Sequence, residues 1–148
     1  MSSEITDLGK DGITESRSDV ERLESALLGL PQIDIEPVHY FSEGIYAREI
    51  TIPAGTALTG KVHSTEHLNI VSKGRIIVIT EDGKEEIIAP RTMVCRAGTK
   101  RGGYALEDTV WTTIHANPSG TRDLVQLESE LIETTTPLIE SEATKCLG

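Results

Sequence analysis

A chain of 148 residues with 37% hydrophobic residues holds enough apolar material for one hydrophobic core but not for two. Its formal net charge of −10 at pH 7 argues against general nucleic-acid binding, because proteins that neutralise phosphates carry a basic face. No stretch approaches the roughly 18 uninterrupted apolar residues of a membrane-spanning helix, and the N-terminus lacks a signal-peptide pattern. These features predict a cytoplasmic protein without a membrane partner.

The N-terminal part of the sequence predicts an arm and one helix. Residues 1–17 are polar and show no apolar period, so a flexible arm is expected there. Ser18 and Glu21 have the spacing of a capping box. Apolar residues then recur at helical spacing before Pro31, namely Val20, Leu23, Leu27 and Leu30. The segment 18–39 is therefore interpreted as a short amphipathic helix and a connection.

From residue 40 onward, short β-forming runs alternate with turn residues, which is typical of a barrel or sandwich. The expected strands are residues 45–52, 57–63, 67–72, 75–80, 85–88, 92–96, 109–116 and 123–128. The dipeptide Asp82-Gly83 between two apolar runs predicts a hairpin. The barrel is expected to span residues 40–133, and an unpatterned tail, residues 134–148, follows it.

Charge is unevenly distributed along this barrel segment. Between Gly60 and Arg101, eight basic residues stand against five acidic ones, a local charge of +3 that leaves −13 for the rest of the chain. A basic centre within an acidic protein indicates a local anion site, although scattered surface charges would give the same count.

Two groups of residues resemble the two sequence motifs of the cupin superfamily, the RmlC-like jelly rolls. The first group comprises residues 53–55, 60–67 and Gly74, and the second comprises Pro90 and residues 96–101. The resemblance implies an all-β fold, a cupin jelly-roll β-barrel, here with one short N-terminal amphipathic helix.

A narrower resemblance concerns four runs within and beside these motifs. Residues 44–50, 60–70, 98–101 and 111–115 are similar to small cupin-like proteins of tailed bacteriophages. This similarity would place the protein in the cytoplasm of a bacterial host.

The cupin resemblance also implies where a metal would sit. Metal-binding cupins supply two His one residue apart, then a Glu or third ligand seven residues before a Gly, and a last His three residues after a Gly. In this sequence Lys61 and His63 stand at the first two positions, His67 at the third and Arg101 at the fourth. The metal site is therefore expected to be degenerate.

Lys61 and Arg101 carry positive charge and offer no electron pair, so both would repel a divalent cation. Only His63 and His67 remain as donors, fewer than the three protein ligands of a usual catalytic site. The lone His115 is interpreted as structural. We therefore expect no bound metal, no cofactor and no catalytic residue set.

The same four positions favour an anionic ligand, because charged donors bind phosphate or carboxylate strongly. Arg48 and Asn69 are placed on inner strand faces, and Tyr104 is a candidate for stacking on a planar ligand. The sequence thus predicts a non-catalytic cupin that binds a phosphate- or carboxylate-bearing small molecule. For a phage protein, that molecule could be a nucleotide-derived messenger held in sequestration.

Several alternatives stay open at this point. Lys61 and Arg101 could instead pair with internal carboxylates such as Glu107 or Asp108 and plug the site. A metal-dependent cupin enzyme that uses His63 and His67 is a second alternative, so the question of enzyme activity stays open. A phage structural or assembly protein is the third. A homo-oligomer, a dimer or larger, is expected in every case because apolar faces need cover.

Overall fold

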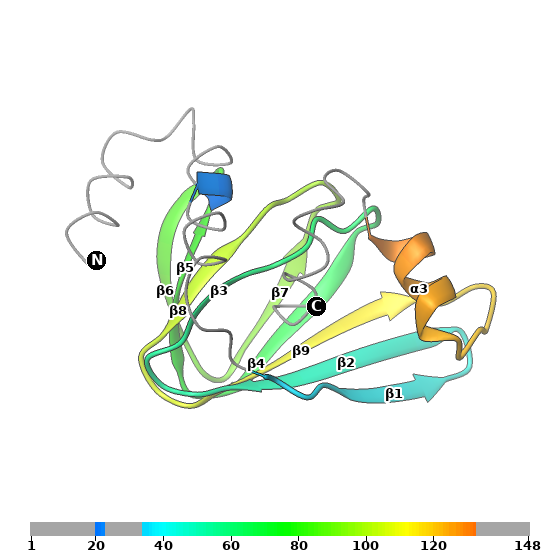
Figure 1. Cartoon of the computed structure of the whole chain (residues 1–148), viewed down its shortest axis with the longest axis horizontal. Coiled ribbons are helices and arrows are strands. Elements are labelled where there is room, and N and C mark those ends of the chain that lie inside the picture. Colours follow the sequence, from blue (N-terminus) through cyan, green and yellow to red (C-terminus); the bar gives the residue numbers. More distant parts are fainter. Residues whose placement is uncertain (1–19, 23–33, 133–148) are drawn as a thin grey trace.

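The computed structural model describes residues 20–22 and 34–132, and in these residues nine strands form two antiparallel sheets (Figure 1). The five-stranded sheet contains, in spatial order, β1 (Val38–Ser42), β2 (Ile45–Ile52), β9 (Thr109–Ala116), β4 (His67–Lys73) and β7 (Arg91–Cys95). The four-stranded sheet contains β3 (Ala57–Thr59), β8 (Gly102–Ala105), β5 (Arg75–Thr80) and β6 (Gly83–Ile88). The all-β jelly roll expected from the sequence is confirmed.

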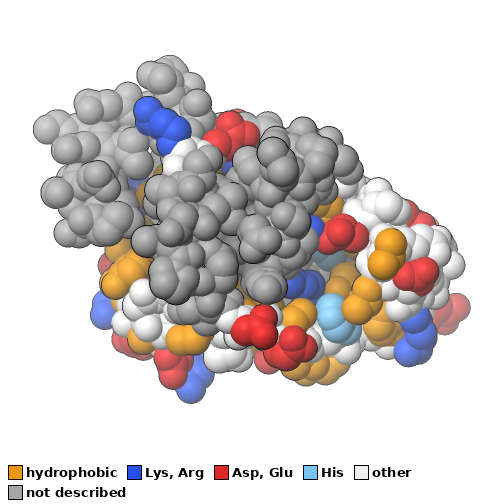
Figure 2. Space-filling model, viewed as in Figure 1, with side chains coloured by type: hydrophobic (Ala, Val, Ile, Leu, Met, Phe, Trp, Pro, Cys, Tyr) orange, Lys and Arg blue, Asp and Glu red, His pale blue; other side chains and the backbone are white. Residues whose placement is uncertain are grey.

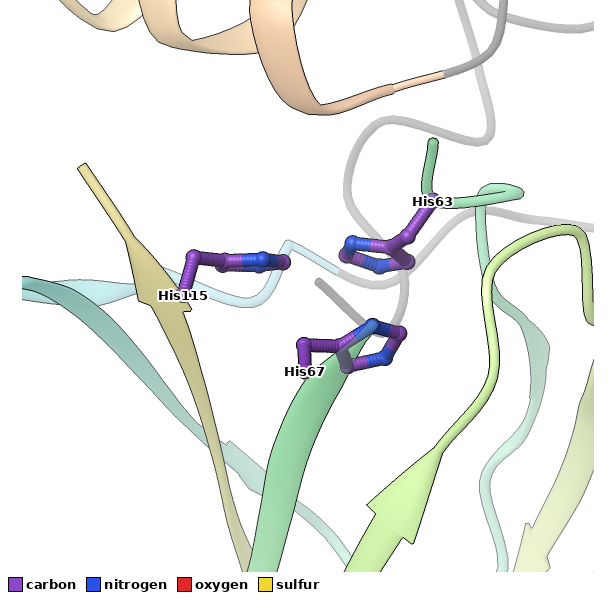
Figure 3. Close-up of side chains that lie close together, drawn as sticks. All are labelled: His63, His67 and His115. Carbon is purple, nitrogen blue, oxygen red and sulfur yellow. The ribbon is translucent and has the colours of Figure 1, made fainter. Parts of the chain in front are cut away.

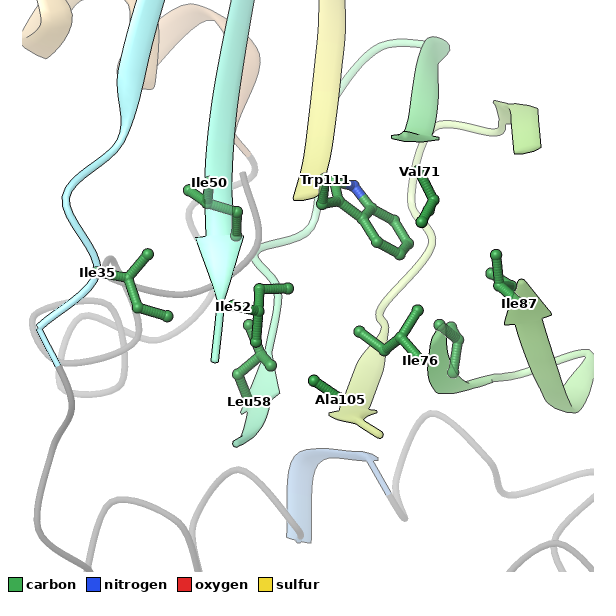
Figure 4. Close-up of a cluster of buried hydrophobic side chains, with 10 residues drawn as sticks. Ile35, Ile50, Ile52, Leu58, Val71, Ile76, Ile87, Ala105 and Trp111 are labelled. Carbon is green, nitrogen blue, oxygen red and sulfur yellow. The ribbon is translucent and has the colours of Figure 1, made fainter. Parts of the chain in front are cut away.

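The apolar core lies between the two sheets at one end of the barrel (Figure 4). Ile50 and Trp111 from the five-stranded sheet meet Ile76 and Ile87 from the other sheet, and each is at most 2% exposed. Burial of this kind supplies the main driving force for folding, and truncating a buried Trp typically costs about 3–5 kcal/mol.

The inward face of the large sheet changes from apolar to polar along its strands. On β9 every second residue is buried, and the series runs from Trp111 through Thr113 to His115. On β4 the same change runs from Val71 through Asn69 to His67. Because β4 and β9 are neighbours, both strands carry their histidines to the same end of the barrel.

Two turns are set by glycine. Gly74 joins β4 to β5 with a φ of 91°, and a Cβ atom there would lie 2.3 Å from the carbonyl oxygen of Asp108. Only glycine fits this position. The predicted hairpin at Asp82-Gly83 is confirmed, since β5 and β6 pair from Arg75↔Ile88 to Thr80↔Gly83.

One predicted strand is wrong, because residues 123–128 begin a helix, α3 (Leu124–Leu131). The side chain of Asp123 caps it by accepting hydrogen bonds from the backbone N–H groups of Val125 and Gln126. Its apolar residues recur at helical spacing, and Leu127 and Leu131 pack on Tyr46 of β2. In Figure 1, α3 lies beside the ends of β2 and β9.

Other differences concern the lengths of elements and the two ends of the chain. β1 and β8 were not predicted, and the strand expected at 57–63 ends at Thr59. Of the predicted N-terminal helix only residues 20–22 are described; they are helical, and Val20 is buried. The rest of that helix, the arm at 1–17 and the tail at 134–148 lie outside the described residues. The described part contains no helix with the length and apolar character needed to span a membrane.

Candidate functional site

Three histidines from separate parts of the chain converge at the polar end of the barrel (Figure 3). His67 begins β4, His115 lies near the end of β9, and His63 comes from the loop between β3 and β4. One ring nitrogen from each lies within 4.8 Å of the others, and all three side chains are buried. We call this group the His cluster.

Hydrogen bonding in the His cluster fixes the tautomer of His67 and leaves buried ring nitrogens without a partner among residues 34–132. The Nδ1 of His67 lies 2.9 Å from the carbonyl oxygen of Thr65 and must donate there, so Nε2 keeps its lone pair. That Nε2 and the Nδ1 of His115 are buried, and neither has a hydrogen-bond partner within residues 34–132. A buried polar atom left without a partner typically costs about 1–3 kcal/mol, so a bound group at this point would relieve a real penalty.

Electrostatics favour the neutral form of two imidazoles of the cluster, His67 and His115. Burial is the main cause that lowers the pKa of His115 to about 4, with smaller contributions from the charges of His67 and Arg48. Burial also lowers the pKa of His67, with a smaller lowering from Arg101, while the Thr65 hydrogen bond and Glu66 act in the opposite direction. Neutral imidazole is the form that binds a transition metal.

Backbone pairing explains why His63 reaches the cluster. His63 forms an isolated bridge with Ile132 directly after α3, and the carbonyl oxygen of His63 accepts a hydrogen bond of 2.9 Å from the N–H of Gly98. The N–H of Ser64 donates to the carbonyl oxygen of Leu131 at 2.7 Å. The loop that carries His63 is thus fixed to the end of α3 and to the turn at Gly98.

Lys61 does not direct its charge at the cluster, which corrects the expectation that it would repel a metal. Its ammonium group forms an ion pair with Glu128 of α3, and its side chain is 8% exposed. The plugging alternative named Glu107 and Asp108 as partners, but the carboxylate that Lys61 finds belongs to α3.

Arg101 is buried beside the cluster, and it does not pair with the expected carboxylates. Its guanidinium carbon lies 5.6 Å from the centroid of the Trp111 ring, and burial lowers its pKa. Glu107 binds Arg75 at 2.9 Å, and Asp108 accepts a hydrogen bond from the N–H of Ala54. No carboxylate in residues 34–132 forms an ion pair with Arg101.

Asn69 and Tyr104, two of the predicted ligand-binding residues, use their side chains elsewhere than in the His cluster. The Oδ1 of Asn69 accepts hydrogen bonds from Trp111 and Thr113, and its Nδ2 donates to the sulfur of Cys95. Its amide is therefore used inside the barrel. Tyr104 sits on β8 next to Ala105, which faces the core, so strand alternation turns the Tyr104 side chain to the outer face.

A pocket of about 230 Å³ opens beside the His cluster, between α3 and the ends of β1, β2 and β9. It brings together three of the predicted ligand-binding residues, Arg48, Lys61 and His63, and adds His115. His67, Asn69, Arg101 and Tyr104 are not among its lining residues. Figure 2 shows histidine at the surface of the face in view, close to hydrophobic, basic and acidic side chains.

The sequence alone did not bring His115 together with His63 and His67, so it offered two imidazoles where the structure brings three together. The sequence did place Trp111 and His115 on one strand face, and the burial of Trp111 fixes that face as the inner one. What the sequence lacks is the pairing of β4 with β9, which sets His115 against His67 across a long separation in the chain.

Solved structures show which fold this is. Salicylate 1,2-dioxygenase from Pseudaminobacter salicylatoxidans has a TM-score of 0.54 at 12% identity, over 78% of this chain and 34% of that one. KdgF from a Halomonas species has a TM-score of 0.51 at 18% identity, over 62% of this chain and 84% of that one. A cupin-2 domain protein from Shewanella frigidimarina has a TM-score of 0.48 at 14% identity, over 63% and 91%. The first two likenesses agree with the jelly-roll fold that the two sheets form.

No family model and no curated protein sequence matches this chain. The likeness to solved structures extends to the fold alone, so the function has to be argued from the site.

Proposed function

We propose that this chain is a metal-binding cupin in which His63, His67 and His115 hold one divalent transition metal beside a small-molecule pocket. The observation that carries the proposal is the convergence of three buried imidazoles with ring nitrogens within 4.8 Å of one another. The inward nitrogens of His67 and His115 support it, because a metal would replace the hydrogen bonds that these atoms lack within residues 34–132. The backbone carbonyl that fixes the ring of His67 is a usual partner of a metal-ligating histidine.

The donor set restricts the class of metal. Imidazole nitrogen suits zinc, iron, copper and nickel rather than magnesium or calcium, which prefer oxygen. Three protein ligands with one side open to a pocket are the pattern of a catalytic site, whereas structural zinc sites use four. A metal bound there would supply Lewis acidity toward a ligand in the pocket.

The buried charge of Arg101 opposes the metal, and this opposition limits the affinity of the site. The charge of Arg101 lowers the pKa of His67, so the field of Arg101 acts on one of the three proposed metal ligands. A divalent cation at the cluster would feel the same repulsion more strongly. An anionic ligand that binds together with the metal would offset it, so the proposed metal site and the predicted anionic ligand are compatible.

Ligand binding without catalysis remains the second candidate, and the pocket beside the cluster favours it equally. Turnover by the metal-loaded protein would separate the enzyme from the binder. The phage origin, the sequestration of a nucleotide-derived messenger, the scaffold role in a virion, the cytoplasmic location and the homo-oligomer all stay predictions.

The test is a titration of the metal-free protein with Co²⁺, followed by visible absorption and by elemental analysis. We expect one metal per chain, and weaker binding in His63→Ala, His67→Ala and His115→Ala. His39 is the matched control, because it is the fourth histidine of the chain and lines the pocket outside the cluster. Equal loss of cobalt in His39→Ala, or no uptake by the parent protein, would contradict the proposal.

A further inference from the structure

The outer face of the five-stranded sheet carries a continuous row of apolar side chains. Side chains alternate between the two faces of a strand, so the chain neighbours of the buried residues Tyr46, His67 and His115 point outward. Direct cross-strand pairing joins five outward residues across all five strands, in the order Tyr40, Ala47, Ile114, Leu68 and Val94. We call these five residues the apolar row.

Much of the apolar row is open to solvent. Val94 is 68% exposed, Tyr40 51% and Leu68 38%. The helix α3 lies on the other side of the sheet, because it packs on Tyr46, which points inward. Single exposed apolar residues are common on protein surfaces, whereas a contiguous apolar patch marks a contact surface.

The positions on either side of the apolar row hold almost no charge. The row on one side consists of Val38, Glu49, Thr112, Ile70 and Thr92. The row on the other side contains Ser42, Ile45 and Ala116. Glu49 is the one charged residue of these three rows. Its carboxylate accepts a hydrogen bond from the hydroxyl of Tyr40, which raises the pKa of that tyrosine.

The outer face of the four-stranded sheet is charged instead. Ile76 and Ile87 point into the core, so alternation turns Arg75, Glu86 and Lys84 outward. Arg75 and Glu86 form an ion pair at 3.0 Å. In a chain with 26% charged residues and a net charge of −10, three adjoining rows with a single carboxylate differ from an ordinary solvated surface.

The size of this outer face fits a contact between two proteins. Five strands about 4.8 Å apart and three rows about 6.6 Å apart give a face of roughly 24 by 20 Å. Two such faces together bring roughly 1,000 Å² into contact, which is the size that a specific interface needs.

We infer that a second copy of this chain docks on the apolar row, with the two five-stranded sheets packed outer face to outer face. Nucleic acid and anionic membranes are attracted by positive charge, and the face offers one carboxylate. Two chains with a net charge of −10 repel each other, so they meet best where neither presents charge.

Sheet geometry and symmetry agree with this occupant. Stacked sheets lie about 10 Å apart with strand directions within about 30°, so that side chains of the two faces interdigitate. Ile114 is the middle residue of the apolar row and lies on the central strand, β9. A two-fold axis at Ile114 would therefore bring the row onto its own copy. The His cluster lies on the inner face, so the inference does not depend on the proposed metal.

Sedimentation equilibrium on the full chain tests the inference. We expect the parent protein to be a dimer in micromolar solution. Leu68→Glu and Val94→Glu should each raise the dissociation constant roughly tenfold or more, because a carboxylate would then lie against the apolar row of the second copy. Ile88→Glu is the matched control, since Ile88 is 57% exposed on the outer face of the other sheet, and it should keep the parent value.

Complementary charges separate a lost contact from a damaged fold. Ile114→Glu and Ile114→Lys should each be monomeric alone, and their mixture should form a heterodimer, because opposite charges then meet near the axis. A parent protein that stays monomeric throughout the micromolar range, or a mixture that stays monomeric, would overturn the inference. So would a dimer that Ile88→Glu weakens as much as Val94→Glu does. A monomeric parent whose free energy of unfolding falls in Val94→Glu would mean that the chain covers this face itself.

Discussion

The imidazole rings of His63 and His115 stack with 4.7 Å between their centroids and 18° between their planes, although His63 lies in a loop and His115 on β9. His67 lies 4.3 Å from His63 by the same measure. A metal that joins these rings would tie the loop to two strands and bind the folded chain only. Metal should therefore stabilise the protein.

The first prediction is a metal-dependent melting temperature. Free Zn²⁺ at 100 times the dissociation constant should add about 2.7 kcal/mol to the free energy of unfolding. Thermal unfolding with zinc, and again after a chelator removes it, measures this difference. A melting temperature that changes neither with zinc nor with the chelator would contradict this prediction. It would agree with the expectation from the sequence that two histidines alone cannot hold a metal.

The second prediction concerns the metal-free protein at low pH. Burial holds the pKa of His115 near 4 in the folded chain, against an ordinary value of 6.5. Between these values the unfolded chain binds a proton that the folded chain does not, so the free energy of unfolding falls as the pH falls from 6.5 towards 4. The loss from this residue amounts to about 3 kcal/mol at most.

Urea unfolding at pH 7.5 and at pH 4.5 measures that loss, with a chelator present. His115→Gln should show a smaller difference between the two pH values, because the variant lacks the group that titrates. An equal change in the free energy of unfolding with pH in the parent and in the variant would show that groups other than His115 cause it.

Local pattern was enough to predict the barrel, and it failed where structure depends on distant pairing. Turn residues such as Gly74 and Asp82-Gly83 act over a few positions, so the sequence shows them directly. Residues 123–128 contain apolar residues that suit a strand as well as a helix, and the choice depended on the cap at Asp123. Short runs of this kind are ambiguous by period alone.

The site was predictable in part for the same reason. His63 and His67 stand close together in the sequence, within the motif that resembles cupins. His115 joins them only through the register of β4 and β9. The ion-pair partner of Lys61 could not be predicted either, because Glu128 lies within residues 123–128, which the sequence predicts as a strand and which belong to α3.

The third prediction concerns the ion pair between Lys61 and Glu128. The side chain of Lys61 is 8% exposed and that of Glu128 is 50% exposed, so Glu128→Gln leaves a mostly buried ammonium group without its carboxylate. We expect a loss of about 1–2 kcal/mol, less than for a fully buried pair, because water still reaches Glu128.

Urea unfolding of two further variants checks the origin of that loss. Adding Lys61→Met to Glu128→Gln should recover part of it, since the double variant has no charge to bury. Glu43→Gln is the control, because Glu43 is exposed and forms no ion pair within the described residues, and it should stay within about 0.5 kcal/mol of the parent. A double variant that is less stable than Glu128→Gln would show that the packing of Lys61 matters more than its charge.

The fourth prediction concerns Arg101, which is 6% exposed and has no ion pair within residues 34–132. Arg101→Met replaces the guanidinium with an apolar side chain that can still pack on Trp111. If Arg101 plugged the site through a hidden carboxylate, the change would strand that negative charge and cost about 3–5 kcal/mol. Because no carboxylate in the described part pairs with it, we expect unchanged or higher stability.

The same variant should bind metal more tightly, and this second effect separates electrostatics from packing. The charge of Arg101 reaches His67, so its removal takes away repulsion toward a cation at the cluster. A rise in zinc affinity of roughly tenfold corresponds to about 1.4 kcal/mol, a modest value for charges near a protein surface. Competition with a coloured chelator measures it, and Arg96→Met is the control because Arg96 pairs with Asp82 in an exposed position. Weaker zinc binding in Arg101→Met would mean that Arg101 supports the His cluster instead of opposing the metal.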